Sequence, residues 1–130
     1  MKLIKADLLM ARQGIELYKN KELKEIKNQA ACHLHQAAEK LIKIQINKSG
    51  VTYHNKSLYV HNLKSLISYT DSLLIEAIIP INIRKHALII TDWEVSGRYD
   101  IHFSVKINSL EKYYREISKW YDALYKKGIR

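Results

Sequence analysis

The chain has 130 residues, of which 47% are apolar, and it holds only four glycines and one proline. This composition is sufficient for one domain with its own core and argues against a disordered chain. The scarcity of turn-forming residues favours long helices over many short strands. Twenty-two Lys and Arg against 13 Asp and Glu give a formal net charge of +9. Such a charge attracts polyanions such as RNA or nucleotides, although lysines dispersed over solvated helix faces would give the same total.

Several classes of protein are excluded by the residue pattern. Cys32 is the only cysteine, so no internal disulfide can form and a reducing compartment fits. Lys5, Asp7 and Arg12 interrupt the first residues before a signal-peptide core can develop. No stretch approaches the roughly 18 apolar residues of a membrane span. We therefore expect a cytoplasmic protein without a membrane partner.

Apolar residues recur at steps of three and four in two N-terminal stretches, which predicts two amphipathic helices. The first is expected to end at Asn20, and the second to run from about Lys21 to Ile46. Glu39 and Lys43 should form an ion pair on the exposed side of the second helix. The predicted buried positions are Ile4, Leu8, Ala11, Ile15 and Tyr18 in the first helix and Ile26, Ala30, Leu34, Ala37, Leu41 and Ile44 in the second.

The middle of the chain is expected to form shorter helices separated by loops. Residues 47–57 show no periodicity and read as a loop. Asn62 is a good N-cap for a short third helix. Thr70 or Asp71 would cap a fourth, which Pro80 should end or kink because proline cannot donate to the helical ladder.

The C-terminal part returns to helix. Residues 83–95 fit a buried helix or a strand by pattern alone, and the helical surroundings favour helix, with Gly97 closing it. A three-four rhythm over 103–124 predicts a long final helix, ended by Gly128. The whole chain, 1–130, is thus expected to be a single all-α domain. It would be an up-and-down bundle of four long helices plus a short helix.

Arg98 and His102 are the first candidate site. Four positions apart on a helix, they would share one face with Cβ atoms about 6 Å apart. A neutral imidazole could then accept the proton of a ribose 2′-hydroxyl, and a guanidinium could stabilise the charge that develops on the phosphate. Alternatively, Arg98 caps or pairs with a neighbouring helix, through a carboxylate such as Glu39, and His102 is a surface residue.

Other chemistries are less well supported. His33 and His35 are two residues apart, so on a helix they point in different directions and cannot share a metal ion. Cys32 stands alone among small helical residues, and no glycine-rich phosphate loop is present. Nucleotide binding would therefore use helix-borne Arg and Lys side chains. An aromatic cluster could stack bases, or form core or a dimer interface, which helical spacing favours: Tyr113, Tyr114, Trp120, Tyr121 and Tyr125.

Three segments carry a family resemblance. They are the alanine-rich helix with HQAAEKLIK, the HNLxxL segment that begins at His61, and an Arg-Tyr dipeptide expected to open the final helix. In this order they resemble the HEPN domain (higher eukaryotes and prokaryotes nucleotide-binding), over essentially the whole chain. The matching positions are Gln36, Ala37, Ala38, Glu39, Lys40, Lys43, His61, Leu63, Leu66, Arg98 and Tyr99.

The resemblance implies a helical bundle that is commonly a homodimer. Prokaryotic single-domain members are often encoded beside a minimal nucleotidyltransferase and act as the toxin half of a toxin–antitoxin pair. Many members are metal-independent ribonucleases in which an Arg is followed, after four to six residues, by His, and the pairs meet across the dimer interface. Here only three residues separate Arg98 from His102.

Two functions follow as expectations. In the first, a toxin-like protein binds or cuts RNA without metal or cofactor, with Arg98 and His102 as catalytic residues and Arg98, Lys40 and Lys43 as nucleotide- or RNA-binding residues. In the second, the chain is a non-catalytic dimeric module that docks a nucleotidyltransferase partner or holds a nucleotide.

Overall fold

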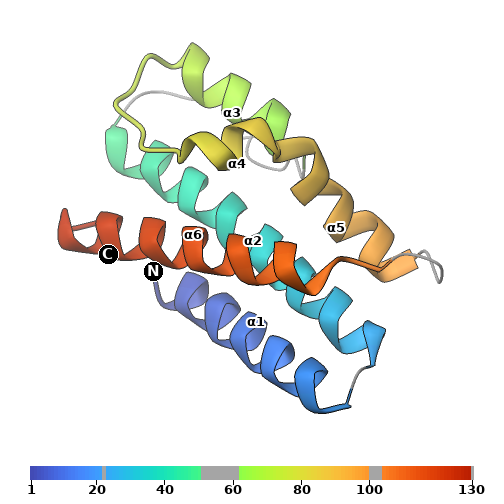
Figure 1. The fold of residues 1–130 in the computed structure, drawn as a ribbon. Helices are drawn as coiled ribbons and strands as arrows, with labels where there is room; N and C mark the ends of the chain where they lie inside the picture. The colour runs from blue at the N-terminus through green and yellow to red at the C-terminus, as the bar shows by residue number, and fades with distance from the viewer. Residues whose placement is uncertain (22, 51–61, 100–103, 130) are drawn as a thin grey trace.

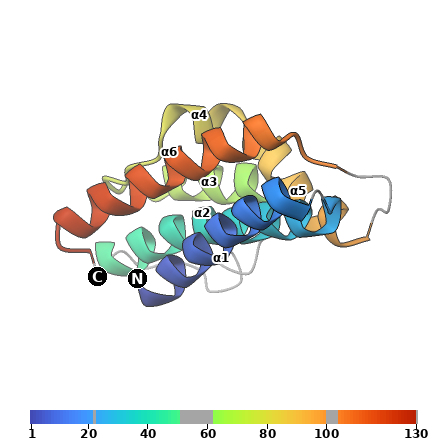
Figure 2. The ribbon, with the colours of Figure 1, turned by 60° about the horizontal axis from the view of Figure 1, so that its bottom comes forward.

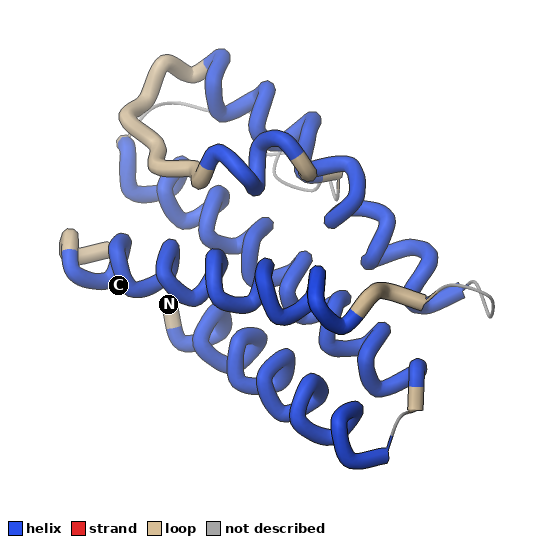
Figure 3. The backbone as a smooth tube through the Cα atoms, viewed as in Figure 1, coloured by secondary structure: helices blue, strands red, loops and turns tan. Residues whose placement is uncertain are grey.

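The computed structural model describes residues 1–21, 23–50, 62–99 and 104–129, apart from the side chains of residues 94, 95 and 97–99. Throughout these ranges the regular structure is helical (Figure 3). The six helices are α1 (Lys2–Lys21), α2 (Lys24–Ser49), α3 (Leu63–Ser72), α4 (Ile81–Lys85), α5 (Ala87–Tyr99) and α6 (Ile107–Lys126). The all-α class is therefore confirmed. The predicted arrangement of four long helices plus one short helix is not: α1, α2 and α6 are long, α5 has 13 residues, and α3 and α4 are short.

The α2 helix is the centre of the domain. It contacts α1, α3, α5 and α6, and Figures 1 and 2 show α1 along one side of it, α5 on another and α6 lying across. Small residues allow this close packing, because Ala31, Ala37 and Ala38 are fully buried and little side chain separates the backbones. A Cβ added to Gly14 of α1 would stand 2.9 Å from the Cβ of Ala30. The α1–α2 crossing thus depends on a glycine facing an alanine.

The periodicity of the first two helices is confirmed with adjusted ends. Most of the predicted positions are buried, whereas Tyr18, Ile26 and Ile44 are half-buried. The second helix runs past Ile46 to Ser49, so the start of the predicted loop is helical. Gly50 ends it with φ 74°, a left-handed conformation that glycine adopts without steric penalty. Residues 51–57 of the predicted loop lie outside the described residues.

The third helix begins as predicted. The side chain of Asn62 accepts a hydrogen bond from the backbone N–H of Ser65 at 3.2 Å, which satisfies one of the free donors at the helix start. The predicted helix after Thr70 or Asp71 is wrong, since α3 continues through both residues. The Thr70 hydroxyl instead donates to the carbonyl of Leu66 at 2.8 Å, inside the helix.

Residues 73–80 are not helical, and Pro80 precedes a helix instead of ending one. Gln45 holds this segment: its amide donates to the carbonyl of Ile78 at 2.9 Å and accepts the Ile78 N–H at 2.7 Å. The indole of Trp120 donates to the same carbonyl at 2.7 Å. Because these side chains satisfy the backbone of Ile78, the segment can stay non-helical while it packs against the core.

The C-terminal part also differs from its prediction. Helix is confirmed over most of residues 83–95, with a break at His86 between α4 and α5. Gly97 does not close the helix, which continues to Tyr99, so Arg98 and Tyr99 lie in the last turn of α5 and do not open the final helix. The final helix begins later, at Ile107.

A buried contact explains the late start of α6. The N–H of Val105 donates to the Asn28 side chain at 3.2 Å, and this bond ties the connecting chain to α2 just before α6. Val105 is itself part of the core. At the other end, Gly128 has φ 88°, as expected for the residue that ends the last helix. Phe103, the predicted first position of that helix, lies outside the described residues. In the part of the chain that the structure describes, no helix is both long and apolar enough to cross a membrane.

Candidate functional site

A groove of about 1030 Å³ opens where α1 begins and where the C-terminal halves of α2 and α6 approach it. Figures 1 and 2 place the start of α1 and the end of α6 at this same end of the molecule. We call it the terminal groove. The residues of its lining that carry charge or an aromatic ring are Lys2, Lys5, Lys40, Lys43, Tyr121, Asp122 and Tyr125.

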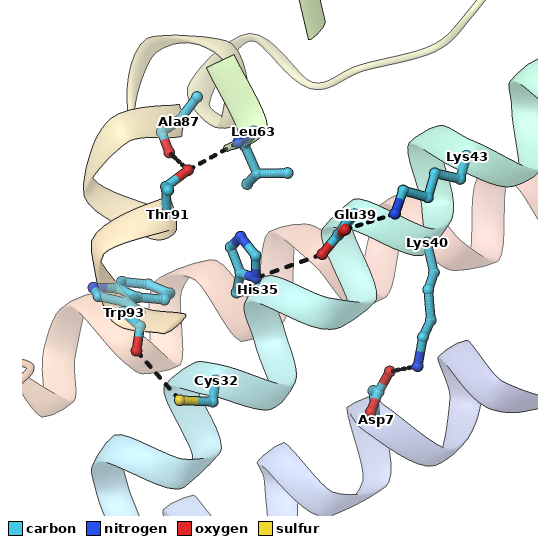
Figure 4. Close-up of polar contacts among 10 residues, drawn as sticks. All are labelled: Asp7, Cys32, His35, Glu39, Lys40, Lys43, Leu63, Ala87, Thr91 and Trp93. Atoms are coloured by element: carbon cyan, nitrogen blue, oxygen red, sulfur yellow. Dashed lines mark hydrogen bonds and ion pairs between the residues drawn. The ribbon is translucent and has the colours of Figure 1, made fainter. Parts of the chain in front are cut away.

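Lys40, one of the predicted binding residues, is held in the wall of the terminal groove by α1. Its ammonium donates to the Asp7 carboxylate at 2.6 Å (Figure 4). The Asp7 side chain is only 9% exposed, whereas that of Lys40 is 38% exposed. His33 also faces Asp7, with its Nδ1 3.1 Å from the carboxylate. The buried carboxylate therefore fixes a lysine whose ammonium still reaches solvent.

Lys43 repeats this arrangement one turn further along α2. Its ammonium donates to Glu39 at 2.7 Å, and the buried ring of His35 lies 3.8 Å from the same carboxylate (Figure 4). The predicted ion pair is thus confirmed, but its placement on an exposed side is wrong because the Glu39 side chain is only 6% exposed. Other helices pack on several sides of α2. A position of α2 that would be exposed in a pair of helices, such as Glu39, is therefore buried in this domain.

The charges of the terminal groove suit an anionic ligand. An ammonium has three N–H donors, so Lys40 and Lys43 can each keep one on a carboxylate and offer others to phosphate oxygens. Lys2 and Lys5 are exposed and form no ion pair with any residue that the structure describes. The start of α1 lies in the same lining and adds the positive end of its helix dipole. Asp122 is the single carboxylate among these lining residues.

Two tyrosines give the terminal groove an aromatic wall. The rings of Tyr121 and Tyr125 are stacked, with centroids 6.0 Å apart and planes at 19°. Tyr125 is 42% exposed, so a flat ring is accessible to a base. Burial, and then the proximity of Tyr125 and Asp122, raise the pKa of Tyr121 above its ordinary value of 10.0. Its hydroxyl therefore stays protonated at neutral pH and can donate a hydrogen bond.

The predicted aromatic cluster divides into two parts. Tyr113 and Trp120 are buried in the core and Tyr114 is half-buried against it, which confirms the core interpretation for these three. Tyr121 and Tyr125 line the terminal groove with Lys40 and Lys43, and Tyr121 also packs against the core. The sequence did not indicate that these two tyrosines share a groove with the two lysines. Their spacing of four residues placed the tyrosines on one face of a helix, but nothing local indicated which helix lay opposite.

The predicted catalytic pair falls largely outside the described part of the structure. Arg98 lies in the last turn of α5, and its side chain is outside the described part of the structure. His102 lies outside the described residues altogether. The end of α5 approaches the N-terminal half of α2, as the contact of Cys32 with the carbonyl of Trp93 at 3.2 Å also indicates (Figures 1 and 4). Lys40 and Lys43 are on the C-terminal half. The structure brings Lys40 and Lys43 together at the terminal groove, whereas the contacts of Arg98 lie outside its described part.

The chain matches no protein-family model, no curated protein and no solved structure. The HEPN assignment consequently stays a prediction from the sequence motifs. Among the described residues, no group of three or more His, Cys, Asp or Glu side chains is placed to hold a metal ion.

Proposed function

We propose that this protein is a HEPN-type binding module that holds a nucleotide, or the phosphates and a base of RNA, in the terminal groove. One observation carries the proposal: Lys40 and Lys43, which are fixed by buried carboxylates, line the same groove as the stacked rings of Tyr121 and Tyr125. Anchored ammonium groups supply charge without a large loss of side-chain entropy on binding. An adjacent aromatic face supplies the stacking surface that a base needs.

Binding in the terminal groove would divide into two parts. Phosphate oxygens would accept hydrogen bonds from Lys40 and Lys43, with Lys2 and Lys5 adding charge at the rim. The base would lie against Tyr125, the more exposed of the two rings. The volume of the groove is at the upper end of the range for small-molecule sites, so a mononucleotide fits and part of a longer strand could extend out of it.

The biological setting that we propose rests on the family resemblance. The module would form a homodimer and would work beside a nucleotidyltransferase partner in a toxin–antitoxin type system. A short nucleotidyltransferase reading frame next to this gene is the expected finding. An isolated gene would remove the support for that setting without affecting the groove.

The function is tested by titrating the protein with fluorescent ATP and with a labelled single-stranded RNA, using anisotropy. The double variant Lys2→Ala/Lys5→Ala removes two exposed charges of the lining, and its matched control, Lys64→Ala/Lys106→Ala, removes two exposed charges elsewhere. We expect the groove variant to bind at least about tenfold more weakly than the control, since local charge matters most within a Debye length. Equal binding by the two variants would show that binding depends on the net charge of the protein and not on the charges in the terminal groove.

A second variant tests how much stacking of the base contributes to binding. Tyr125→Ala should weaken binding of ATP by about 1–3 kcal/mol, the usual worth of stacking, and leave binding of inorganic triphosphate unchanged. Titration with triphosphate alone then separates the phosphate part from the base part. If wild-type protein binds none of ATP, triphosphate and RNA at low salt, the proposed function is rejected.

A further inference from the structure

His33 shares a buried carboxylate with a lysine of the terminal groove. Its Nδ1 lies 3.1 Å from Oδ1 of Asp7, and the Lys40 ammonium lies 2.6 Å from Oδ2 of the same carboxylate. The Asp7 side chain is 9% exposed, whereas the side chains of His33 and Lys40 are 31% and 38% exposed. One buried negative charge therefore lies between an ammonium and an imidazole, and an imidazole can be neutral or cationic near neutral pH.

The contact with Asp7 determines which nitrogen of His33 can change its protonation. An ionised carboxylate only accepts hydrogen bonds, so the Nδ1 that faces it carries a proton whether the ring is neutral or charged. The proton that changes the charge of the ring is therefore taken up at Nε2. Because the His33 side chain is partly exposed, the ring can exchange this proton with solvent.

Protonation of His33 changes the charge at the wall of the terminal groove. With a neutral ring, the charges of Asp7 and Lys40 cancel. With a charged ring, two cations share one carboxylate and the cluster carries a net positive charge beside the groove that Lys40 lines. In the part of the chain that the structure describes, Asp7 is the only carboxylate within ion-pair distance of His33 or Lys40. A bound anion is therefore the group that would neutralise the added charge.

The other charged groups near this cluster are already paired. On α1, Arg12 pairs with Glu16 and Lys19 pairs with Glu111 of α6. On α2, Glu39 pairs with Lys43, and the ring of His35 lies 3.8 Å from the same carboxylate. The His35 side chain is 0% exposed, so of the two histidines beside the groove lysines only His33 is in contact with solvent.

We propose that binding of phosphates in the terminal groove is coupled to protonation of His33, so that the protein holds phosphodiesters more tightly at acidic pH. This inference rests on the proposed function, because it concerns the regulation of the same groove. A phosphate that binds to Lys40 favours the charged ring, and by linkage the charged ring strengthens binding by the same factor. The gain is present below the pH range in which imidazoles titrate and is lost as pH rises through it.

The probe is an oligouridylate without terminal phosphates, because neither its phosphodiesters nor its bases titrate near neutral pH. Isothermal titration calorimetry at about pH 6 and about pH 8 measures its affinity on either side of the imidazole range. Two buffers with different heats of ionisation give the number of protons taken up on binding. Wild-type protein should bind at least about threefold more tightly at the lower pH and should take up part of a proton near pH 7.

Three variants make the test specific. His33→Gln keeps an N–H donor without the charge, and it should lose both the gain at acidic pH and the proton uptake. His33→Lys carries a permanent charge and should bind tightly at both pH values. The control His86→Gln removes a histidine that bonds to Tyr113, and neither of these residues lines the groove. It should behave like wild type. Melting curves at both pH values verify that each variant is folded.

Two results would overturn this inference and leave the proposed function standing. One is equal wild-type affinity at both pH values, and the other is a pH dependence that His33→Gln retains in full, which would place the titrating group elsewhere. Failure of wild-type protein to bind the oligouridylate at either pH would reject RNA binding in the groove and this inference together.

Discussion

The Lys40 ammonium lies 2.6 Å from the Asp7 carboxylate, and this contact joins α1 to the wall of the terminal groove. The two residues are 33 positions apart in the chain. The pair therefore has two roles, because it satisfies a buried charge and also fixes a cation that a ligand can use. Glu39 and Lys43 repeat the arrangement within α2 (Figure 4).

The first prediction concerns this pair. Lys40→Met should lower the free energy of unfolding by about 1–2 kcal/mol, because the buried Asp7 carboxylate loses its closest cation while His33 remains near it. The loss is smaller than for a fully buried pair because Lys40 is partly exposed. Urea denaturation measures it. The double variant Asp7→Asn/Lys40→Met should recover more than half of the loss, and an additive double variant would contradict the explanation.

The second prediction concerns the α1–α2 crossing. Alanine is usually about 1 kcal/mol better than glycine within a helix, but a Cβ at position 14 would stand 2.9 Å from that of Ala30. Gly14→Ala should therefore destabilise the protein, by about 1–2 kcal/mol net. In an Ala30→Gly background the same change should become stabilising, because the opposing methyl group is gone. Thermal or urea unfolding of the four proteins tests both signs.

The third prediction concerns pH. Arg84 donates two hydrogen bonds to Asp71, at 2.9 and 3.0 Å, and lowers the pKa of that carboxyl below its ordinary 3.8. A lowered pKa stabilises the fold above the unfolded value, and the contribution is lost as pH falls through the folded value. Asp71→Asn should thus cost less than about 1 kcal/mol at neutral pH, since both side chains are well exposed. The difference from wild type should shrink as pH falls below the ordinary 3.8 and vanish once the folded-state carboxyl is protonated; a constant difference would exclude the ion pair as its source.

The fourth prediction concerns catalysis. If Arg98 and His102 form a metal-independent ribonuclease site, purified protein should cleave cellular RNA in the presence of EDTA. His102→Ala should abolish cleavage without changing the melting temperature, because only the proton acceptor is removed. RNA that stays intact at a large excess of wild-type protein would reject the catalytic role and leave the binding module as the function.

Local signals predicted the helix ends that depend on neighbouring residues. Asn62 caps α3 with its own side chain, and Gly128 adopts the left-handed conformation where the final helix was expected to end. The Asn62 side chain bonds to the N–H of Ser65, only three residues away. The three-four periodicity of α1, α2 and α6 likewise depends only on spacing along one helix.

The predictions that are wrong concern positions whose structure depends on residues far away in the sequence. A fourth helix after Asp71 was reasonable from its leucines, but Gln45 and Trp120 bind the backbone of Ile78 from 33 and 42 residues away. The sequence predicts an exposed Glu39 because the pattern of one helix does not show how many helices will cover it, and here the side chain is buried. Gly97 has the residue type of a helix end, yet the helix continues through it.

The sequence by itself determined the helical class, the buried faces of α1 and α2, and two lysines that belong to a candidate site. These depend on periodicity and residue type, which are local properties. Only the tertiary structure decided that Lys40 and Lys43 would line one groove with Tyr121 and Tyr125. It also decided that Leu3, Leu9, Met10 and Leu17 of α1 would remain exposed. Both outcomes depend on which helices pack against each other, and this arrangement is determined by the packing of the whole core.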